Sequence, residues 1–156
     1  MAILNIVKEG DPLLRKKSRP VEEITPRILT LLDDMVETMH KAKGCGLAAV
    51  QVGVLRRVVV IEDDKGKLYE LINPRIVAHA GTQEEAEGCL SIPGVWGITR
   101  RPRAVTVRAL DRHGNEVEYT GRDLLARAFC HELDHLDGAL FTDVMIRPLG
   151  KDEVEG

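Results

Sequence analysis

A five-residue stretch, His131-Glu132-Leu133-Asp134-His135, constrains this chain more than any other part of its sequence. In an α-helix, residues four apart lie one above the other, so His131 and His135 can present their imidazoles to a single cation. Glu132 then stands beside the cation without having to bind it. On a helix, this spacing is typical of metal-dependent hydrolases.

The residues around the two histidines predict that helix. An apolar stripe recurs with helical spacing through Leu124, Leu125, Ala128, Phe129 and Leu136. Thr120 or Gly121 is expected to cap the start of the helix, and Gly138 is expected to end it. Both histidines should therefore lie on one real helix.

A third metal ligand has to come from elsewhere in the chain. A catalytic centre of this kind takes three protein ligands and leaves one position for water. Cys89, within Glu87-Gly88-Cys89-Leu90-Ser91, offers a thiolate. Cys89, His131 and His135 are thus the predicted ligands, and a divalent cation there lowers the pKa of water toward neutrality. Glu132 is the predicted general base.

A third segment, Gly44-Cys45-Gly46-Leu47-Ala48-Ala49-Val50-Gln51, places two glycines and a glutamine in one loop. Glycine allows a backbone to come close, and a glutamine side chain can hydrogen-bond to a carbonyl. In this order, the three segments resemble the motifs GxGLAAxQ, EGCxS and HExDH of the peptide deformylases. The resemblance also includes Asn73-Pro74 and Leu136-Asp137-Gly138, so it spans nearly the whole chain.

The resemblance implies a hydrolase that removes the formyl group from the initiator methionine of new bacterial or organellar polypeptides and releases formate. Glu132 would then return its proton to the departing amine. One thiolate with two imidazoles tolerates zinc, iron(II), nickel or cobalt. The resemblance implies iron(II) as the native ion, with nickel or cobalt as working substitutes.

Attack on a formyl carbonyl builds negative charge on its oxygen, which needs donors already in place. The candidates are the Gln51 side-chain amide and the Leu90 backbone N–H, as the resemblance also implies. Gly44 and Gly46 would let the substrate backbone lie close and pair like a strand.

The substrate methionine suits an apolar slot. In the family this slot lies beside the metal-binding helix, which here points to Leu124, Ala128 and Cys45. Arg127 lies near the same wall, where its aliphatic stem can pack while its charged end stays in water. For Trp96, the only tryptophan, a place on the rim of the peptide site and ordinary packing both stay open.

Other residues with ligand chemistry are predicted to stay out of the centre. Cys130 precedes a ligand by one position and is rotated by roughly 100° around the helix, so it is interpreted as a small core residue. His40, His79 and His113 have no matching partners nearby in the sequence and are interpreted as non-ligands.

The chain is expected to form a single domain over residues 1–156, with a short frayed tail from about residue 148. Hydrophobic residues at 44% and charged residues at 30% are typical of a soluble globular protein. The net charge of −3 argues against a nucleic-acid binder, and the basic clusters at 15–19 and 100–103 are interpreted as solvated loops. Longer family members are thought to dock on the ribosome through a C-terminal helix, so that contact stays open here.

Nothing in the chain reads as a signal peptide or a membrane span, so a cytoplasmic location without membrane contact is expected. Three cysteines in such a chain are interpreted as thiols and not as a disulfide framework.

The periodicities predict an α+β fold. Helical spacing follows Thr25 and Pro26, which should begin an amphipathic N-terminal helix. Two hairpins are expected from turn-rich separators, Arg57–Ile61 with Leu68–Ile72 and Ala104–Leu110 with Glu116–Thr120. A further pair is expected between Arg75–Ala80 and Gln83–Glu87. The resemblance implies that antiparallel sheets surround the central metal-binding helix.

Two other functions share parts of this residue pattern. A zincin-like metalloprotease shares the His-Glu-x-x-His helix, but its third ligand is generally a downstream His or Glu. No histidine follows His135, and Cys89 lies upstream. A purely structural metal site would need four protein ligands, often in Cys-x-x-Cys pairs, and none is present.

Overall fold

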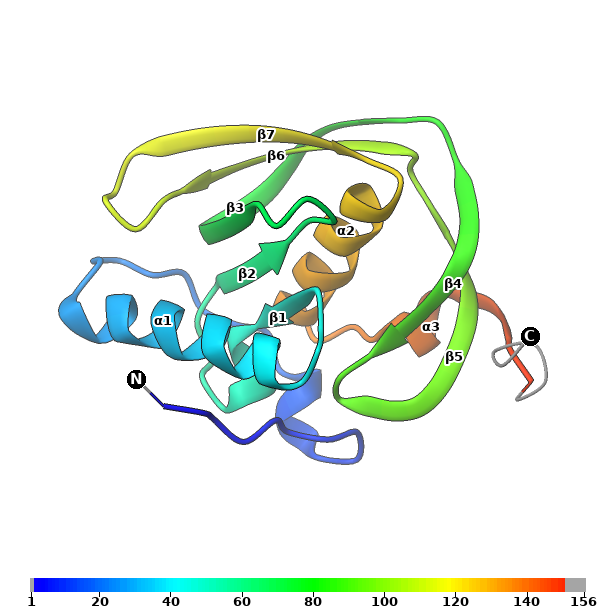
Figure 1. Ribbon diagram of the computed structural model, residues 1–156, viewed down its shortest axis with the longest axis horizontal. Coiled ribbons are helices and arrows are strands. Elements are labelled where there is room, and N and C mark those ends of the chain that lie inside the picture. The colour runs from blue at the N-terminus through cyan, green and yellow to red at the C-terminus, as the bar shows by residue number, and fades with distance from the viewer. Residues whose placement is uncertain (1, 151–156) are drawn as a thin grey trace.

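The computed structural model describes residues 2–150. Two helices, α1 and α2, are the longest, and the other regular structure consists mainly of strands (Figure 1). In chain order the elements are η1 (Pro12–Arg15), α1 (Pro26–Lys41), β1 (Gly46–Ala48), η2 (Ala49–Val52), β2 (Val58–Glu62), β3 (Leu68–Ala80), β4 (Gln83–Cys89), β5 (Ile92–Arg101), β6 (Ala104–Leu110), β7 (Glu116–Arg122), α2 (Leu124–Leu136), α3 (Phe141–Val144) and β8 (Met145–Pro148). Within the described residues, no helix is both long and apolar enough to cross a membrane.

The strands form two antiparallel sheets, which confirms the predicted α+β class. One sheet has the order β1-β2-β3-β6-β7, and the other has the order β4-β5-β8. The two predicted hairpins are β2–β3 and β6–β7. The expected pairing of Arg75–Ala80 with Gln83–Glu87 is wrong. The first segment pairs with β6 and the second with β5, because the chain turns at Gly81 (φ 70°) from one sheet into the other.

Strand β3 is unusually long because it continues through Pro74, where a proline would often end a strand. Its pairing with β6 shifts register between Ile72 and Arg75, and Asn73 there adopts a left-handed φ of 53°. The Asn73 side chain is tied to Val21 by hydrogen bonds to both its N–H and its carbonyl oxygen, 2.8 and 2.9 Å long. A bulge of this kind is a usual place for proline within a sheet.

The two long helices cover opposite faces of the five-stranded sheet (Figure 1). Because side chains alternate along a strand, Val58 and Val60 of β2 pack on the α1 side, whereas Val59 and Ile61 pack on the α2 side. The second sheet contacts α2 through β5. Helix α2, which carries the two predicted histidine ligands, therefore lies in the middle of the molecule, as the family resemblance implied.

The start of α2 differs from the prediction. Thr120 and Gly121 do not cap it, because β7 continues to Arg122 and the cap residue is Asp123, with a φ of 53°. Gly121 faces the helix closely: a Cβ there would come within 2.5 Å of the Leu125 side chain. The other end agrees with the prediction, since Gly138 follows the helix with a φ of 78°.

The first residues of the chain tie two distant loops together. The Val7 N–H donates to the Gln51 carbonyl at 2.7 Å, and the Glu9 N–H donates to the Ser91 carbonyl at 2.8 Å. This segment thereby places η2 beside the turn between β4 and β5. The expected frayed tail falls largely on residues 151–156, which lie outside the described part, and just ahead of them the Leu149 N–H donates to the Trp96 carbonyl at 2.8 Å.

Candidate metal centre and active site

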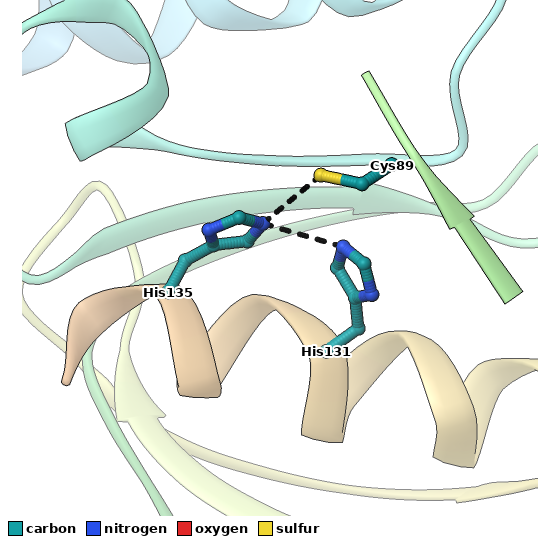
Figure 2. Close-up of side chains that lie close together, drawn as sticks. All are labelled: Cys89, His131 and His135. Carbon is teal, nitrogen blue, oxygen red and sulfur yellow. Dashed lines mark hydrogen bonds between the residues drawn. The ribbon is translucent and has the colours of Figure 1, made fainter. Parts of the chain in front are cut away.

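The three predicted ligands meet at one point. His131 and His135 come from successive turns of α2, and Cys89 comes from the end of β4 (Figure 2). The Nε2 atom of His135 lies 3.3 Å from Cys89 Sγ and 3.3 Å from the Nε2 atom of His131. All three ligand atoms lie within 4.8 Å of one another, and no second cluster of this kind occurs among residues 2–150.

These distances fit a divalent cation. In a tetrahedral site with bonds of about 2.0–2.3 Å to nitrogen and sulfur, ligand atoms lie about 3.3–3.5 Å apart. A ligating histidine must be neutral. Burial opposes protonation of His131, but Glu132, Cys89 and Glu87 outweigh it and hold the pKa of that imidazole well above its usual value, so a cation has to displace its second proton. Burial, reinforced by His131, lowers the pKa of His135 to about 3, so this imidazole is neutral at neutral pH. The donor set of one sulfur and two nitrogens leaves room for a further ligand.

His131 is oriented by a buried carboxylate, that of Glu87, for which the sequence alone predicted no role. Glu87 Oε1 lies 2.6 Å from His131 Nδ1. Burial opposes ionisation of Glu87, but hydrogen bonds from His131 and Arg101 outweigh it and lower its pKa to about 2. The ionised Glu87 accepts a hydrogen bond from the Nδ1–H of His131, so that Nε2 is the nitrogen available to a cation at the centre.

Arg101 holds Glu87 in place. Its Nη2 donates to Glu87 Oε1 at 2.8 Å, and its Nη1 donates to Asp134 Oδ2 at 2.7 Å. Thr99 Oγ1 donates to the second oxygen of Glu87 at 2.5 Å. The interpretation of the 100–103 cluster as solvated loop is therefore wrong for Arg101, which is buried, while Arg100 and Arg103 are exposed.

Glu132 is buried next to the centre, and one of its carboxylate oxygens lacks a hydrogen-bond partner. Its Oε1 has no hydrogen-bond partner, and its Oε2 lies 4.0 Å from His131 Nε2. Burial raises the pKa of Glu132 to about 7. Gly46 makes room for it, because a Cβ at Gly46 would come within 2.6 Å of Glu132 Oε2. An unpaired buried carboxylate oxygen is costly and marks a place where a further hydrogen-bond donor belongs.

Gln51 is held in one orientation beside Cys89. Its Oε1 accepts from the Ala48 N–H at 2.9 Å, while its Nε2 donates to Ser91 Oγ at 3.0 Å and lies 3.6 Å from Cys89 Sγ. Leu90 follows in the adjacent turn, and its side chain packs on Gly44, where a Cβ would come within 2.6 Å of it. Both glycines thus have a packing reason within the chain, and close approach of a substrate backbone to them stays a prediction.

A cavity of about 500 Å³ opens onto this centre. Its lining comes from residues 43–46, from η2, from β4 and the turn that follows it, from the start of β5 and from α2. The predicted site residues among them are Gly44, Cys45, Gly46, Gln51, Cys89, Leu90, Leu124, Ala128, His131 and Glu132. Arg127 also lines it, and its Nη1 donates to Gln83 Oε1 at 2.8 Å. Every residue predicted for the slot therefore borders the same cavity as Cys89 and His131.

The remaining cysteines and histidines stay out of the centre. Cys130 is buried in the core between α2 and the sheet, and burial raises its pKa to about 11. Cys45 lines the cavity without joining the ligand group. His40 pairs with Glu62 on the surface.

Residues 3–150 match the family model for polypeptide deformylase. The chain belongs to the polypeptide deformylase family. It is 60% identical over 156 residues to a peptide deformylase of Caldanaerobacter subterraneus subsp. tengcongensis, a match that covers all of this chain and 98% of the relative. A peptide deformylase of Thermoanaerobacter pseudethanolicus is 58% identical over 99% of this chain and 97% of its own length.

Solved structures of the family share the fold. A peptide deformylase from Legionella pneumophila superposes with a TM-score of 0.89 at 44% identity, covering 97% of this chain and 89% of that one. One from Ehrlichia chaffeensis, in complex with actinonin, gives a TM-score of 0.90 at 39% identity over 99% of this chain and 93% of that one. The chain is accordingly a metal-dependent hydrolase that removes the formyl group from nascent peptides, and nothing in the comparisons supports the metalloprotease alternative.

Proposed function

We propose that Cys89, His131 and His135 hold one iron(II) ion and that Glu132 and Gln51 carry out deformylation of formyl-methionyl peptides beside it. The observation that carries this proposal is the convergence of three ligand atoms next to a buried carboxylate oxygen without a partner. When bound, a divalent cation supplies Lewis acidity that polarises the formyl carbonyl and makes water a better nucleophile at neutral pH. Nickel, cobalt or zinc fit the same donors, and the family resemblance favours iron(II).

Glu132 is placed to handle the protons of the reaction. Its free Oε1 takes a proton from the attacking water and returns it to the amine as the C–N bond breaks. Burial next to His131 keeps the carboxyl group away from bulk water, so that the proton stays within the site.

The developing charge on the formyl oxygen is met by two donors. Gln51 can turn toward the substrate the amide hydrogen that here faces Cys89 Sγ, because its other hydrogen is held by Ser91 Oγ and its Oε1 is held by the Ala48 N–H. The Leu90 backbone N–H is the second donor. The methionine side chain occupies the part of the cavity bordered by Cys45, Leu124 and Ala128, with Gly44 and Gly46 along the substrate backbone.

We further propose that the protein works in the cytoplasm, where formylated chains are synthesised. A stable contact with the ribosome is a separate proposal, which cosedimentation of the purified protein with ribosomes would test.

The experiment that tests the centre is a comparison of the three cysteines. Anaerobically purified Cys89→Ser, Cys45→Ser and Cys130→Ser are assayed for metal per chain and for formate release from formyl-Met-Ala-Ser. We expect Cys89→Ser alone to lose metal, because serine is a poor donor for a borderline cation. The two matched variants should keep a full complement. Full occupancy in Cys89→Ser would remove this residue from the site.

A second experiment compares the loss of activity in air for the iron form and the nickel form of the unmodified protein. A thiolate beside iron(II) is open to oxidation, so the iron form should lose activity in air, and the nickel form should lose it more slowly. Equal decay of the two forms would contradict the assignment of iron chemistry to this centre.

A further inference from the structure

The tip of the hairpin between β4 and β5 is exposed and carries no charge. Residues 93–96, Pro-Gly-Val-Trp, are all exposed, whereas the strand beyond them buries Gly97, Thr99 and Arg101. All four tip residues line the cavity that Cys89 and His131 also border. Uncharged apolar surface next to a binding cavity is a usual mark of ligand contact.

Trp96 is the largest side chain of this tip, and its ring is held in place. Trp96 and Gly88 are partners across the two strands, and a Cβ on Gly88 would come within 2.9 Å of the Trp96 ring. The indole therefore lies directly on the Gly88 backbone. On the other side of the strand, β8 pairs with the residues that follow, and the Leu149 N–H donates to the Trp96 carbonyl. Despite these contacts Trp96 remains 41% exposed.

The cavity extends beyond the part that a formyl-methionine residue is proposed to occupy. The formyl group belongs at the ligand atoms and the methionine side chain belongs beside Leu124 and Ala128. The substrate residues that follow must continue through the rest of the cavity, which is walled by the Gly44–Gly46 loop and by the hairpin with Gly88 and Trp96. A fixed aromatic surface there gains most from a partner that covers it with apolar atoms.

We propose that Trp96 determines specificity for the substrate residues that follow methionine, by packing its exposed face against an apolar or aromatic side chain. The inference rests on the proposed function, because it assigns the path of the same peptide beyond the first residue. A rigid ring loses little conformational entropy when it is covered. Because this contact lies away from the formyl group, it is the same in the ground state and in the transition state, so it should lower KM and leave the chemical step unchanged.

Formate release is compared for formyl-Met-Ala-Phe, formyl-Met-Phe-Ala and formyl-Met-Ala-Ala. For the unmodified protein, kcat/KM for the better aromatic peptide should exceed that for the alanine peptide by about threefold to tenfold, the range that an aromatic pair contributes. Trp96→Ala should reduce this preference to nearly one through KM, and Trp96→Phe should keep part of it. Leu68→Ala, which removes an equally exposed apolar side chain away from the cavity, should leave the preference intact.

A second measurement does not depend on turnover. Trp96 is the only tryptophan, so intrinsic fluorescence reports on this position alone. Adding the product Met-Ala-Phe or Met-Phe-Ala to the metal-loaded protein should shift the emission to shorter wavelength and protect it from acrylamide, more than Met-Ala-Ala does at equal saturation. An unchanged kinetic preference in Trp96→Ala, or calorimetrically detected binding of both aromatic products without a change in emission, would overturn the inference. Absence of formate release from all three peptides would instead count against the proposed function.

Discussion

The helices α1 and α2 pack on opposite faces of one sheet, and both bury polar side chains. On α1, Thr38 Oγ1 donates to the Asp34 carbonyl and accepts from the Leu4 N–H, while the Asp34 carboxylate accepts from the Ala2 N–H. On α2, His131 and His135 point their Nε2 atoms toward each other, and Glu132 and His135 each keep a buried polar atom without a partner. Glu37 Oε2 of α1 and Ser18 Oγ also lack a partner, so an open polar atom indicates a ligand centre only where several donor atoms converge, as they do on α2.

The largest effects are expected from substitutions of Glu132 and His135 on α2. Glu132→Gln keeps the size of the side chain but cannot accept the water proton, so formate release should fall by roughly 100-fold or more while metal content stays full. His135→Ala should instead lose the metal itself. Both are measured as metal per chain and kcat/KM on anaerobic protein. Near-normal turnover in a fully loaded Glu132→Gln variant would remove Glu132 from its assigned role.

A smaller effect is expected one layer behind the ligands. Arg101→Lys keeps the charge but loses the forked contacts to Glu87 and Asp134, so His131 is held less firmly. Metal affinity should fall by about tenfold to 100-fold, as measured by competition with a chelator. Arg100→Lys, one residue away and exposed, is the matched control and should bind metal normally. Equal affinities for the two variants would mean that Glu87 orients His131 without help.

The smallest change is expected on α1. Thr38→Val keeps the shape of the side chain but leaves the Leu4 N–H without an acceptor, which should lower the free energy of unfolding by about 1–2 kcal/mol in urea denaturation. Metal content and kcat/KM should match those of the unmodified protein, because α1 packs on the face of the sheet away from the centre. Loss of metal in this variant would show that the two faces are coupled.

The residues of the centre could be predicted because their pattern is local. The spacing of His131 and His135 depends only on helix geometry, and the hairpins β2–β3 and β6–β7 carry their own turn residues. Strands β1 and β8 have three and four residues, too few for an alternation to stand out. Their pairing is decided by the sheet that they join.

The contacts that complete the centre depend on register between distant segments. Glu87 meets Arg101 only because β4 and β5 pair in one particular register, and Arg101 in isolation has the sequence context of a surface residue. The alternation of Thr99 and Arg101 on one face of β5 was the available signal, although it required knowing that this segment is a strand. Likewise, Gly46 is small because Glu132 lies against it, and these residues are far apart in the sequence.

The hydrogen bonds from Val7 and Glu9 to the carbonyls of Gln51 and Ser91 join two segments that line the cavity. They brace the loop that presents Gln51 against the turn that presents Leu90, although neither Val7 nor Glu9 borders the cavity. Val7 and Glu9 lie outside every helix and strand, where local opening needs the least energy. Inactivation would then begin at this edge while both sheets and the three predicted ligands are still in place.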